Sequence, residues 1–321
     1  MAKLIAVTGA TGQQGGAVVT VMLAAGWRVR GVTRDPGSAK AKRLAATGVE
    51  IVKADFSDEN SLRAAFDGAH AIFAMTSFID YAWSGKHTVD EACALEEADA
   101  LRLARAAASS EALRHYIFST TPSASRLTGG KCPVPHMDAK ARADERIRGE
   151  IPGLARRMTS LFVGFYPSNF VSDMFRPHEV PGTNGSHVLI LPCSPGTGVQ
   201  TSGDMTVTPG IWVRQILARS EKCMGKYASV QTEWCTYSDM AKAWGEVTEK
   251  RAAFVSCSEE DYVGLWGANG AEFLLQLRFN ASVEDWLAGL GELFVTATEL
   301  GIDEFEVGGF QHALEVIKDQ L

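Results

Sequence analysis

Short apolar runs alternate with amphipathic stretches from residue 3 to about residue 162, and this rhythm constrains the fold more than any other feature of the sequence. Such alternation is typical of parallel strands joined by helical crossovers. The runs that read as strands are residues 4–7, 28–33, 49–52, 71–75, 115–119 and 157–162. The segments that read as helices are residues 13–25, 39–46, 59–66, 89–108 and 137–148, with Asp58 as the N-cap of the third. The pattern predicts an α/β fold with a doubly wound parallel sheet.

The rhythm breaks after Phe162. Prolines and glycines then crowd residues 167–198, which predicts loops and a hairpin rather than further crossover units. A mixed tail ends in an amphipathic stretch over residues 310–321. With 321 residues, of which 46% are hydrophobic, the chain is long and apolar enough for two domains. We predict a sheet domain over residues 1–160 and a smaller mixed α/β domain over residues 161–321, with some exchange of chain between the two.

A glycine-rich loop separates the first expected strand from the first expected helix. It reads Gly9-Ala10-Thr11-Gly12-Gln13-Gln14-Gly15. Glycines let such a turn form and let its backbone approach a pyrophosphate, while the helix N-terminus supplies free N–H groups and the positive end of its dipole. The spacing is G-x-x-G-x-x-G, and a tight turn alone would also need glycine. The strand-loop-helix context nevertheless predicts a Rossmann domain that binds an adenine dinucleotide.

The end of the second expected strand bears on which dinucleotide binds. An acid at this place chelates the ribose diol of NAD, whereas an arginine meets the 2′-phosphate of NADP. Both types are present, because Arg34 is followed by Asp35. Arg34 comes first, and Lys40 and Lys42 can reinforce it unless they form only a solvated basic cluster. We therefore predict NADP(H) rather than NAD as the cofactor.

Two other expected strands end in side chains suited to a nucleotide. Asp55 and Phe56 follow the third strand, and Thr76, Ser77 and Phe78 follow the fourth. Ligands of parallel α/β sheets bind at the carboxyl ends of the strands. We expect the first pair to lie against adenine and the second group to border the nicotinamide ribose.

Charge and composition exclude several classes of partner. The 38 acidic and 31 basic residues give a net charge of −7, and no long basic run is present, so we expect neither nucleic acid nor a membrane surface as a partner. No C-x-x-C pair occurs, and we expect no metal site. The first residues enter a strand-like run without a signal segment, so we expect a soluble, cytoplasmic protein.

With these motifs, the chain resembles the NmrA-like family, whose members are atypical short-chain dehydrogenase/reductases. The resemblance rests on the glycine loop, on residues 33–36 (Thr-Arg-Asp-Pro), on residues 128–140 and on residues 164–170 (Gly-Phe-Tyr-Pro-Ser-Asn-Phe). It implies a Rossmann domain, a smaller C-terminal domain, preferential NADP binding and a cleft between the two. Some members are redox-sensing regulators that bind the cofactor without turnover. Others reduce small molecules, and fungal members tailor secondary metabolites.

The resemblance also implies a set of cofactor contacts, which we carry over by position together with the glycine loop. The expected contacts are Gly9, Ala10, Thr11, Gly12, Gln13, Gln14, Gly15, Arg34, Asp35, Ser38, Asp55, Phe56, Thr76, Ser77, Phe78, Lys140, Tyr166 and Asn169.

His136 and Lys140 lie four residues apart in an expected helix, so they project from one face. Short-chain dehydrogenases have Tyr-x-x-x-Lys here, and the resemblance implies that Lys140 holds the nicotinamide ribose. His136 then takes the place of the tyrosine as a candidate general acid, since the reference pKa of histidine is about 6.5. An adjacent lysine charge would disfavour the protonated imidazole. The alternative is an imidazole that faces substrate or caps the helix without transferring a proton.

Several hydroxyls offer other proton donors. Ser119, Thr120 and Thr121 end the fifth expected strand, Tyr166 follows the sixth, and Tyr81 lies in the loop after the fourth. We take Lys140, His136 and Tyr166 as the catalytic candidates and the remaining hydroxyls as alternatives. The loop over residues 81–87 is aromatic and basic and is a candidate lid.

Aromatic residues gather in the second half of the chain. They are Phe162, Phe165, Tyr166, Phe170, Phe175, Trp212, Trp234, Trp244, Trp266 and Trp286. Aromatic side chains at a domain junction suit a bulky apolar substrate, although most of the tryptophans are expected to fill the core of the smaller domain. Phe165 and Tyr166 are better candidates for the cleft, because they follow a strand end.

Two functions remain open from the sequence. The first is an NADP(H)-dependent tailoring enzyme that transfers hydride to or from a C=O, C=N or C=C bond of an apolar small molecule. In a variant of this function the hydride is returned, so that a cyclisation proceeds with no net redox change. The second is an NADP-sensing regulator without turnover that binds a protein partner. His136 in the tyrosine position favours the regulator, and the aromatic residues favour the enzyme.

Overall fold

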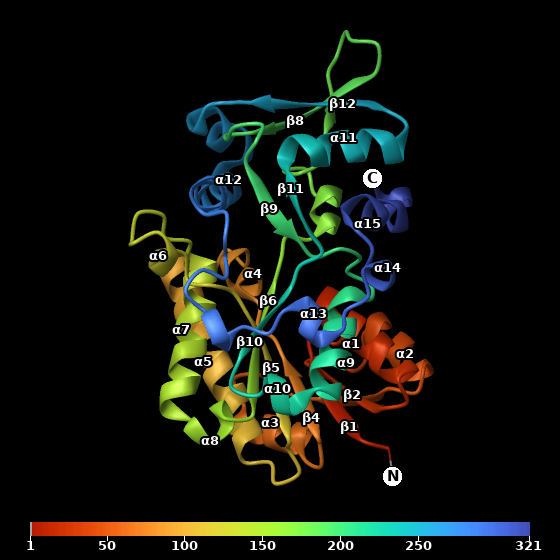
Figure 1. Cartoon of the computed structure of the whole chain (residues 1–321), viewed down its shortest axis with the longest axis vertical. Helices are drawn as coiled ribbons and strands as arrows, with labels where there is room; N and C mark the ends of the chain where they lie inside the picture. The colour runs from red at the N-terminus through yellow and green to blue at the C-terminus, as the bar shows by residue number, and fades with distance from the viewer. Residues whose placement is uncertain (1) are drawn as a thin grey trace.

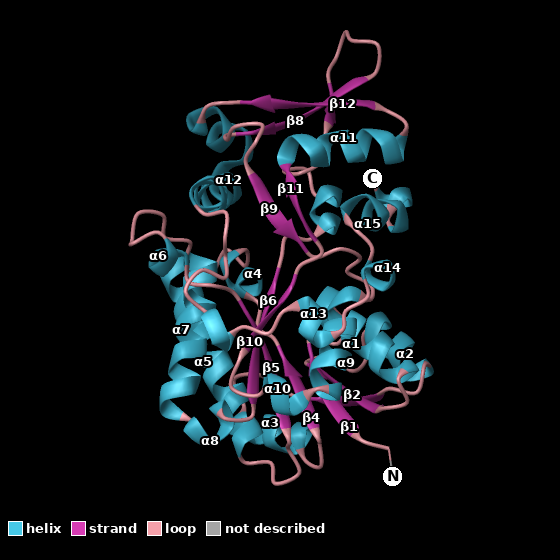
Figure 2. Cartoon of the chain, in the orientation of Figure 1, coloured by secondary structure: helices cyan, strands magenta, loops and turns pink. Residues whose placement is uncertain are grey.

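The computed structural model describes residues 2–321, and the largest sheet within them has seven strands (Figures 1 and 2). Its strands are β1 (Leu4–Thr8), β2 (Arg28–Thr33), β3 (Glu50–Lys53), β4 (Ala71–Ala74), β5 (His115–Thr120), β6 (Met158–Val163) and β10 (Tyr227–Val230). The order is β10-β6-β5-β4-β1-β2-β3, and neighbouring strands run parallel throughout. The strand order reverses between β1 and β4, which confirms the predicted doubly wound Rossmann sheet.

Alternate side chains of β1 enter two separate cores, because successive residues of a strand point to opposite faces. Ile5 and Val7 pack with α1 (Gln13–Ala24), α9 (Thr208–Ala218) and α10 (Ser220–Cys223), and α2 (Ala39–Ala46) adds Leu44 to this core. Leu4 and Ala6 pack with the helices of the other face. These helices are α3 (Glu59–Phe66), α5 (Val89–Ala108), α7 (Pro135–Glu150) and α8 (Pro152–Ala155).

Local signals position the helices as expected. The predicted helices over residues 39–46, 59–66 and 89–108 have the observed bounds, and the Asp58 carboxylate accepts the N–H groups of Asn60 and Ser61 as the N-cap of α3. The helix α7 begins two residues earlier than expected, with Pro135 in its first turn. His136 therefore lies in the first turn of the helix.

The large sheet contains one strand, β10, that the sequence pattern does not predict. The expectation of loops and a hairpin holds for β7 (His178–Glu179) and β8 (Ser186–Leu191), which pair antiparallel. Beyond residue 198 the chain returns to the large sheet through α9 and adds β10 beside β6, a seventh strand where the apolar runs predict six. The strand β10 reads only Tyr-Ala-Ser-Val, and such a short run carries little signal of its own.

The smaller part of the molecule lies above the sheet in Figure 1. It holds a three-stranded sheet β12-β8-β7 and an antiparallel pair of β9 with β11. Its main helices pack around Tyr237 and Trp244. The remaining bounds are β9 (Gly198–Thr201), β11 (Glu233–Thr236), β12 (Arg251–Ser256), α4 (Phe78–Ala82), α6 (Ala124–Leu127), α11 (Tyr237–Thr248), α12 (Glu259–Ser282), α13 (Ala297–Leu300), α14 (Glu304–Val307), α15 (Phe310–Val316), η1 (Pro167–Val171), η2 (Gly291–Leu293) and η3 (Lys318–Gln320).

Residue 160, where we divided the chain, lies inside β6. Beyond it, α9, α10, β10 and residues such as Val295 and Leu300 contribute to the core on the α1 face of the large sheet. In the part of the chain that the structure describes, no helix has both the length and the apolar character needed to cross a membrane.

Candidate functional site

The glycine loop closes tightly on itself between β1 and α1. Gly9 has a positive φ of 63°, and its carbonyl accepts the N–H of Gly12 at 2.8 Å. A Cβ on Gly15 would lie 2.2 Å from the Gly9 carbonyl oxygen. The helix α1 begins at Gln13, and no side chain caps it. Its first N–H groups are therefore available to an external anion at the carboxyl edge of the sheet.

Replacing Gly15 by alanine is expected to lower the free energy of unfolding by about 1–3 kcal/mol, because the new methyl group displaces backbone rather than a flexible side chain. Gly16→Ala is the matched control, since its Cβ would lie 3.7 Å from the nearest atom, the Ala10 oxygen, which is an ordinary contact. Urea unfolding of the two variants measures the difference. Equal stability of the two would contradict the close approach.

A cleft of about 550 Å³ runs along the glycine loop and the ends of β2, β3 and β4. It brings together eleven of the expected cofactor contacts: Gly9, Thr11, Gly12, Gln13, Gln14, Arg34, Asp55, Phe56, Thr76, Ser77 and Tyr166. The Asp55 carboxylate accepts the hydroxyl and backbone N–H of Ser57, and these two hydrogen bonds lower its pKa. Asp55 is therefore an ionised acceptor on the floor of the cleft near neutral pH.

Of the seven expected contacts that do not line this cleft, four lie in the core, in the loop or in the turn before α2. Ala10 is buried in the core, and Gly15 packs against the loop backbone. The Asp35 carboxylate turns away to accept the Gly37 N–H at 2.9 Å, and the Ser38 hydroxyl caps α2 by accepting the Ala41 N–H. Asp35 is thus occupied by its own turn, whereas Arg34 lines the cleft beside Lys40.

Arg34 meets a carboxylate at this edge of the cleft. Its Nη2 lies 2.9 Å from Oδ2 of Asp80, a residue of α4 that also lines the cleft. The other carboxylate oxygen of Asp80 accepts the Ser77 hydroxyl at 3.0 Å. Arg34 therefore already binds an anionic group where a nucleotide phosphate is expected.

A second cavity of about 350 Å³ adjoins the cleft, and Phe78, Lys140 and Asn169 line it. Six residues line both spaces: Gln14, Met75, Thr76, Ser77, Ile79 and Tyr166. The walls of the second cavity carry many aromatic side chains and come from both parts of the molecule. Its aromatic residues are Phe78, Trp83, Phe165, Tyr166, Phe175, Tyr237, Phe273 and Trp286. We call the second cavity the apolar cavity, and the cleft along the glycine loop the cofactor cleft.

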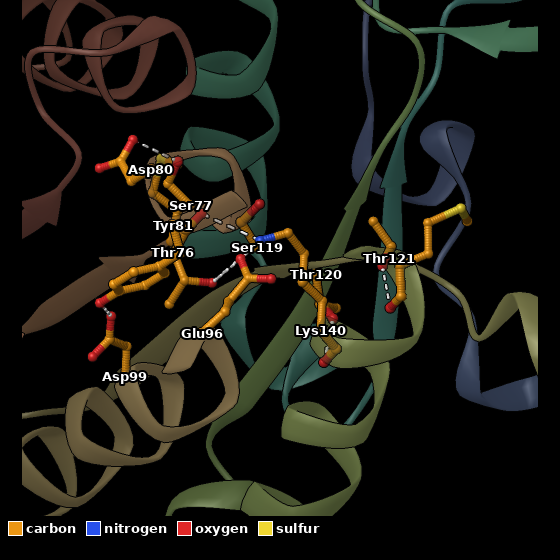
Figure 3. Close-up of polar contacts among 12 residues, drawn as sticks. Thr76, Ser77, Asp80, Tyr81, Glu96, Asp99, Ser119, Thr120, Thr121 and Lys140 are labelled. Carbon is orange, nitrogen blue, oxygen red and sulfur yellow. Dashed lines mark hydrogen bonds and ion pairs between the residues drawn. The ribbon is translucent and has the colours of Figure 1, made fainter. Parts of the chain in front are cut away.

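Lys140 projects from α7 toward Thr76 at the end of β4 and forms an ion pair with Glu96 of α5 (Figure 3). Its ammonium also donates to the hydroxyl and the carbonyl of Thr76, at 3.2 and 3.3 Å. The Thr76 hydroxyl donates to the same Glu96 oxygen at 2.9 Å. The Glu96 side chain is 1% exposed, and its second oxygen has no hydrogen-bond partner among the described residues. The ammonium is thus fixed at the border of the two spaces.

His136 also lines the apolar cavity, and its ring nitrogens face α12. Nδ1 lies 3.0 Å from Oε1 of Glu272, and Nε2 lies 3.0 Å from Oε1 of Gln276. Lys140 is therefore paired with Glu96, and His136 with Glu272. Both nitrogens are occupied by side chains of the smaller part of the molecule.

Tyr166 lies where the cofactor cleft and the apolar cavity meet. Its oxygen accepts a hydrogen bond from the Gln14 amide, whose oxygen in turn accepts the Ser119 hydroxyl at 2.7 Å. Burial raises the pKa of Tyr166, and the Gln14 hydrogen bond partly offsets this effect. The Tyr166 O–H is thus held at the junction with its own proton uncommitted among the described residues.

Each of the other candidate hydroxyls already donates its proton in a hydrogen bond to another residue. Ser119 donates to Gln14, Thr120 to the Lys140 carbonyl at 3.1 Å, and Thr121 to the Met137 carbonyl at 2.9 Å. Tyr81 donates to Asp99 on the cofactor side, and burial and this carboxylate raise its pKa (Figure 3). Thr120 and Thr121 therefore anchor α7, and Tyr81 belongs to the wall of the cofactor cleft.

The tryptophans divide between core and cavity. Trp212 and Trp244 are fully buried, and Trp234 is exposed. Trp286 is the member of the predicted set (Trp212, Trp234, Trp244, Trp266 and Trp286) that lines the apolar cavity. Within the described residues, no group of three His, Cys, Asp or Glu side chains is arranged to hold a metal ion.

Sequence reasoning missed Glu96, Asp80, Glu272 and Gln276. The sequence does indicate that Glu96 is buried and paired. It lies on the apolar face of an expected helix, between Cys93 and Ala100, where a lone acid needs a partner. The other three lie on segments far apart in the sequence, and no spacing connects them with Arg34 or His136.

The parallel sheet, the glycine loop at its carboxyl edge and the cleft along that edge define a Rossmann protein of the dinucleotide-binding type. The chain belongs to the NmrA-like family, whose sequence model matches residues 1–292, and the resemblance noted from the sequence is thereby confirmed. An NmrA-like family domain-containing protein of Dictyostelium discoideum is 25% identical over 82% of this chain and 83% of its own. The NmrA-like family domain-containing oxidoreductase himF of Aspergillus japonicus is 29% identical over 80% and 76%.

Solved structures share the fold. NmrA, a negative transcriptional regulator solved in complex with NAD, superposes with a TM-score of 0.77 at 20% identity over 99% of this chain and 97% of that one. The triphenylmethane reductase of Citrobacter sp., solved with NADP(H), superposes with a TM-score of 0.68 at 21% identity over 99% of each chain. Regulators and reductases thus share this architecture.

Proposed function

We propose that this chain is a cytoplasmic NADP(H)-dependent oxidoreductase that tailors a bulky apolar small molecule of secondary metabolism, by hydride transfer to or from a C=O, C=N or C=C bond. The apolar cavity carries the proposal, because it adjoins the cofactor cleft and is walled by aromatic side chains. The curated relatives named oxidoreductases and the solved neighbours bound to NADP or NADP(H) support it.

The residues of the cofactor cleft suit a dinucleotide. A Cβ on Gly9 would meet Met75 and a Cβ on Gly15 would meet the Gly9 carbonyl, so the tight loop requires both glycines, and the uncapped N-terminus of α1 suits a pyrophosphate. Arg34 and Lys40 are the cations for a 2′-phosphate, and Asp55 and Phe56 lie at the adenosine end. When bound, NADP(H) supplies or accepts the hydride.

In this proposal the chain itself contributes a proton and a fixed charge. Tyr166 holds the proton, on an oxygen that Gln14 orients at the junction. Lys140 borders the same place, and Glu96 with Thr76 keeps its ammonium from moving. The aromatic walls exclude water and orient an apolar substrate by shape.

Arg34→Ala is expected to weaken NADP⁺ binding by about 2 kcal/mol, because a bidentate arginine contact to phosphate is lost. NAD⁺ lacks the 2′-phosphate, so its affinity is expected to change far less. Calorimetric titration with both nucleotides measures the two effects, and Lys42→Ala, which removes a neighbouring charge that does not line the cleft, is the control. An equal loss for both nucleotides would overturn the NADP assignment.

Deuterium transfer tests the function itself. NADPH deuterated at C4 of the nicotinamide is offered with bulky apolar ketones, imines and quinones, and mass spectrometry detects deuterium in the products. We expect transfer to at least one of them. If the protein binds NADPH but calorimetry finds no affinity for any of these compounds, the apolar cavity is not a substrate site and the proposal fails.

One observation favours a second candidate, an NADP-sensing regulator without turnover that binds a protein partner. His136 stands where the resemblance expects tyrosine, and Glu272 and Gln276 occupy both of its ring nitrogens. The solved structure described as a negative transcriptional regulator has the same fold. Under this reading, binding of NADP⁺ without affinity for any apolar compound is the expected outcome of the same experiment.

A further inference from the structure

We propose that Asp80 is a specificity-determining residue of the cofactor cleft, whose carboxylate holds Arg34 until a 2′-phosphate takes its place. The inference rests on the proposed function, since it requires NADP(H) to bind along the cleft. Asp80 lies outside the glycine loop and outside residues 33–36, on the short helix α4.

The contacts of Arg34 define the competition. Asp80 is the hydrogen-bond partner of the Arg34 guanidinium among the described residues, at 2.9 Å. The two side chains are 70% and 48% exposed, and exposed ion pairs are weak. A phosphate that carries nearly two negative charges and three acceptor oxygens binds the same guanidinium more strongly than one carboxylate does. The exchange is therefore favourable for NADP(H), whereas NAD(H) leaves the pair intact.

The carboxylate that is displaced keeps a partner. Oδ1 of Asp80 accepts the Ser77 hydroxyl at 3.0 Å, so the release of Arg34 does not leave Asp80 without hydrogen bonds. Its negative charge nevertheless stays beside the phosphate, which lowers the affinity for NADP(H) by like-charge repulsion. Asp80 thus acts against NADP(H) twice, as a competitor for Arg34 and as a neighbouring charge.

The helix α4 connects this exchange with the apolar cavity. Asp80 and Tyr81 line the cofactor cleft, and Phe78 and Trp83 line the apolar cavity. Trp83 is 48% exposed, and its ring lies 6.4 Å from the ring of Phe273 on α12. Loss of the Arg34 contact removes one of the side-chain contacts that α4 makes on its cofactor side, and the hydrogen bond from Tyr81 to Asp99 remains. We therefore expect a 2′-phosphate bound at one end of the cleft to change the surroundings of Trp83, directly after α4.

Calorimetry of Asp80→Asn tests the competition. We expect NADP⁺ affinity to rise by about 1.5-fold to fivefold, the range for an exposed charge interaction, with NAD⁺ affinity unchanged. Asp90→Asn, which removes an exposed charge that lines neither space, is expected to match the wild type for both nucleotides. An equal change for NADP⁺ and NAD⁺, or no change for NADP⁺, overturns the role of Asp80. If the wild-type protein binds neither nucleotide, the proposed function fails, and this inference fails with it.

The fluorescence of Trp83 tests the connection to the cavity. Adenosine 2′,5′-bisphosphate and adenosine 5′-monophosphate differ only in the 2′-phosphate. The difference between the wild type and Trp83→Phe isolates the emission of this tryptophan. We expect the bisphosphate alone to shift it, and Asp80→Asn to show the shifted emission before any ligand is added. Identical responses to the two nucleotides overturn the link between the phosphate and α4.

Discussion

Replacing Glu96 by leucine is expected to lower the free energy of unfolding by about 3–5 kcal/mol, which is the effect of removing one partner of a buried ion pair. Glu96 is fully buried, and its partner Lys140 is 17% exposed. Without the carboxylate, the ammonium keeps only the two oxygen atoms of Thr76 as acceptors. Denaturation in guanidinium chloride measures the loss.

The double variant Glu96→Leu with Lys140→Met separates the ion pair from the packing of α5. It removes both charges and replaces them with apolar side chains, so most of the lost stability is expected to return. A single variant as stable as the wild type, or a double variant no more stable than the single one, contradicts the assignment of this pair.

Replacing Tyr166 by phenylalanine is expected to lower the rate of hydride transfer by about 10²–10⁴-fold, the usual contribution of a positioned general acid or base. The Tyr166 hydroxyl is the one at the junction whose proton is uncommitted among the described residues, because Ser119, Thr120 and Thr121 donate elsewhere. Cofactor affinity is expected to change little. Single-turnover kinetics with a substrate found by deuterium transfer measures the step itself.

His136→Phe is the companion to the Tyr166 variant. Both residues line the apolar cavity, but only Tyr166 also lines the cofactor cleft. If Tyr166 is the proton donor, the His136 variant is expected to retain single-turnover hydride transfer. A loss confined to the His136 variant reverses the two roles. It would make the imidazole the acid and leave Tyr166 as a wall of the cavity.

The fold was largely predictable, because its signals are local. Apolar runs gave the first six strands, and the Asp58 cap and the periodicity of residues 89–108 gave helix bounds that the structure reproduces. The strand β10 was not predictable in this way. It is four residues long and joins the sheet only through its partner β6, which precedes it by some 70 residues in the sequence.

The candidate site was predictable only where it lies on one strand end or one helix. The glycine loop, Arg34, Asp55 and Thr76 were expected at the cleft from topology, and the structure brings them together. The ion-pair partners of Arg34, Lys140 and His136 were not expected. Glu96 of α5 reaches Lys140 of α7, Asp80 reaches Arg34 from the short helix α4, and Glu272 reaches His136 from α12. Such pairs depend on tertiary packing, which no local spacing encodes.

A crystal structure of the protein with NADP⁺ tests the central claim most directly. We expect the 2′-phosphate on Arg34 in place of Asp80, the pyrophosphate at the N-terminus of α1, and nicotinamide C4 facing the apolar cavity with the Tyr166 hydroxyl beside it. A nicotinamide directed away from that cavity, or one whose reactive face is covered by protein, would contradict the account and leave the chain a cofactor sensor.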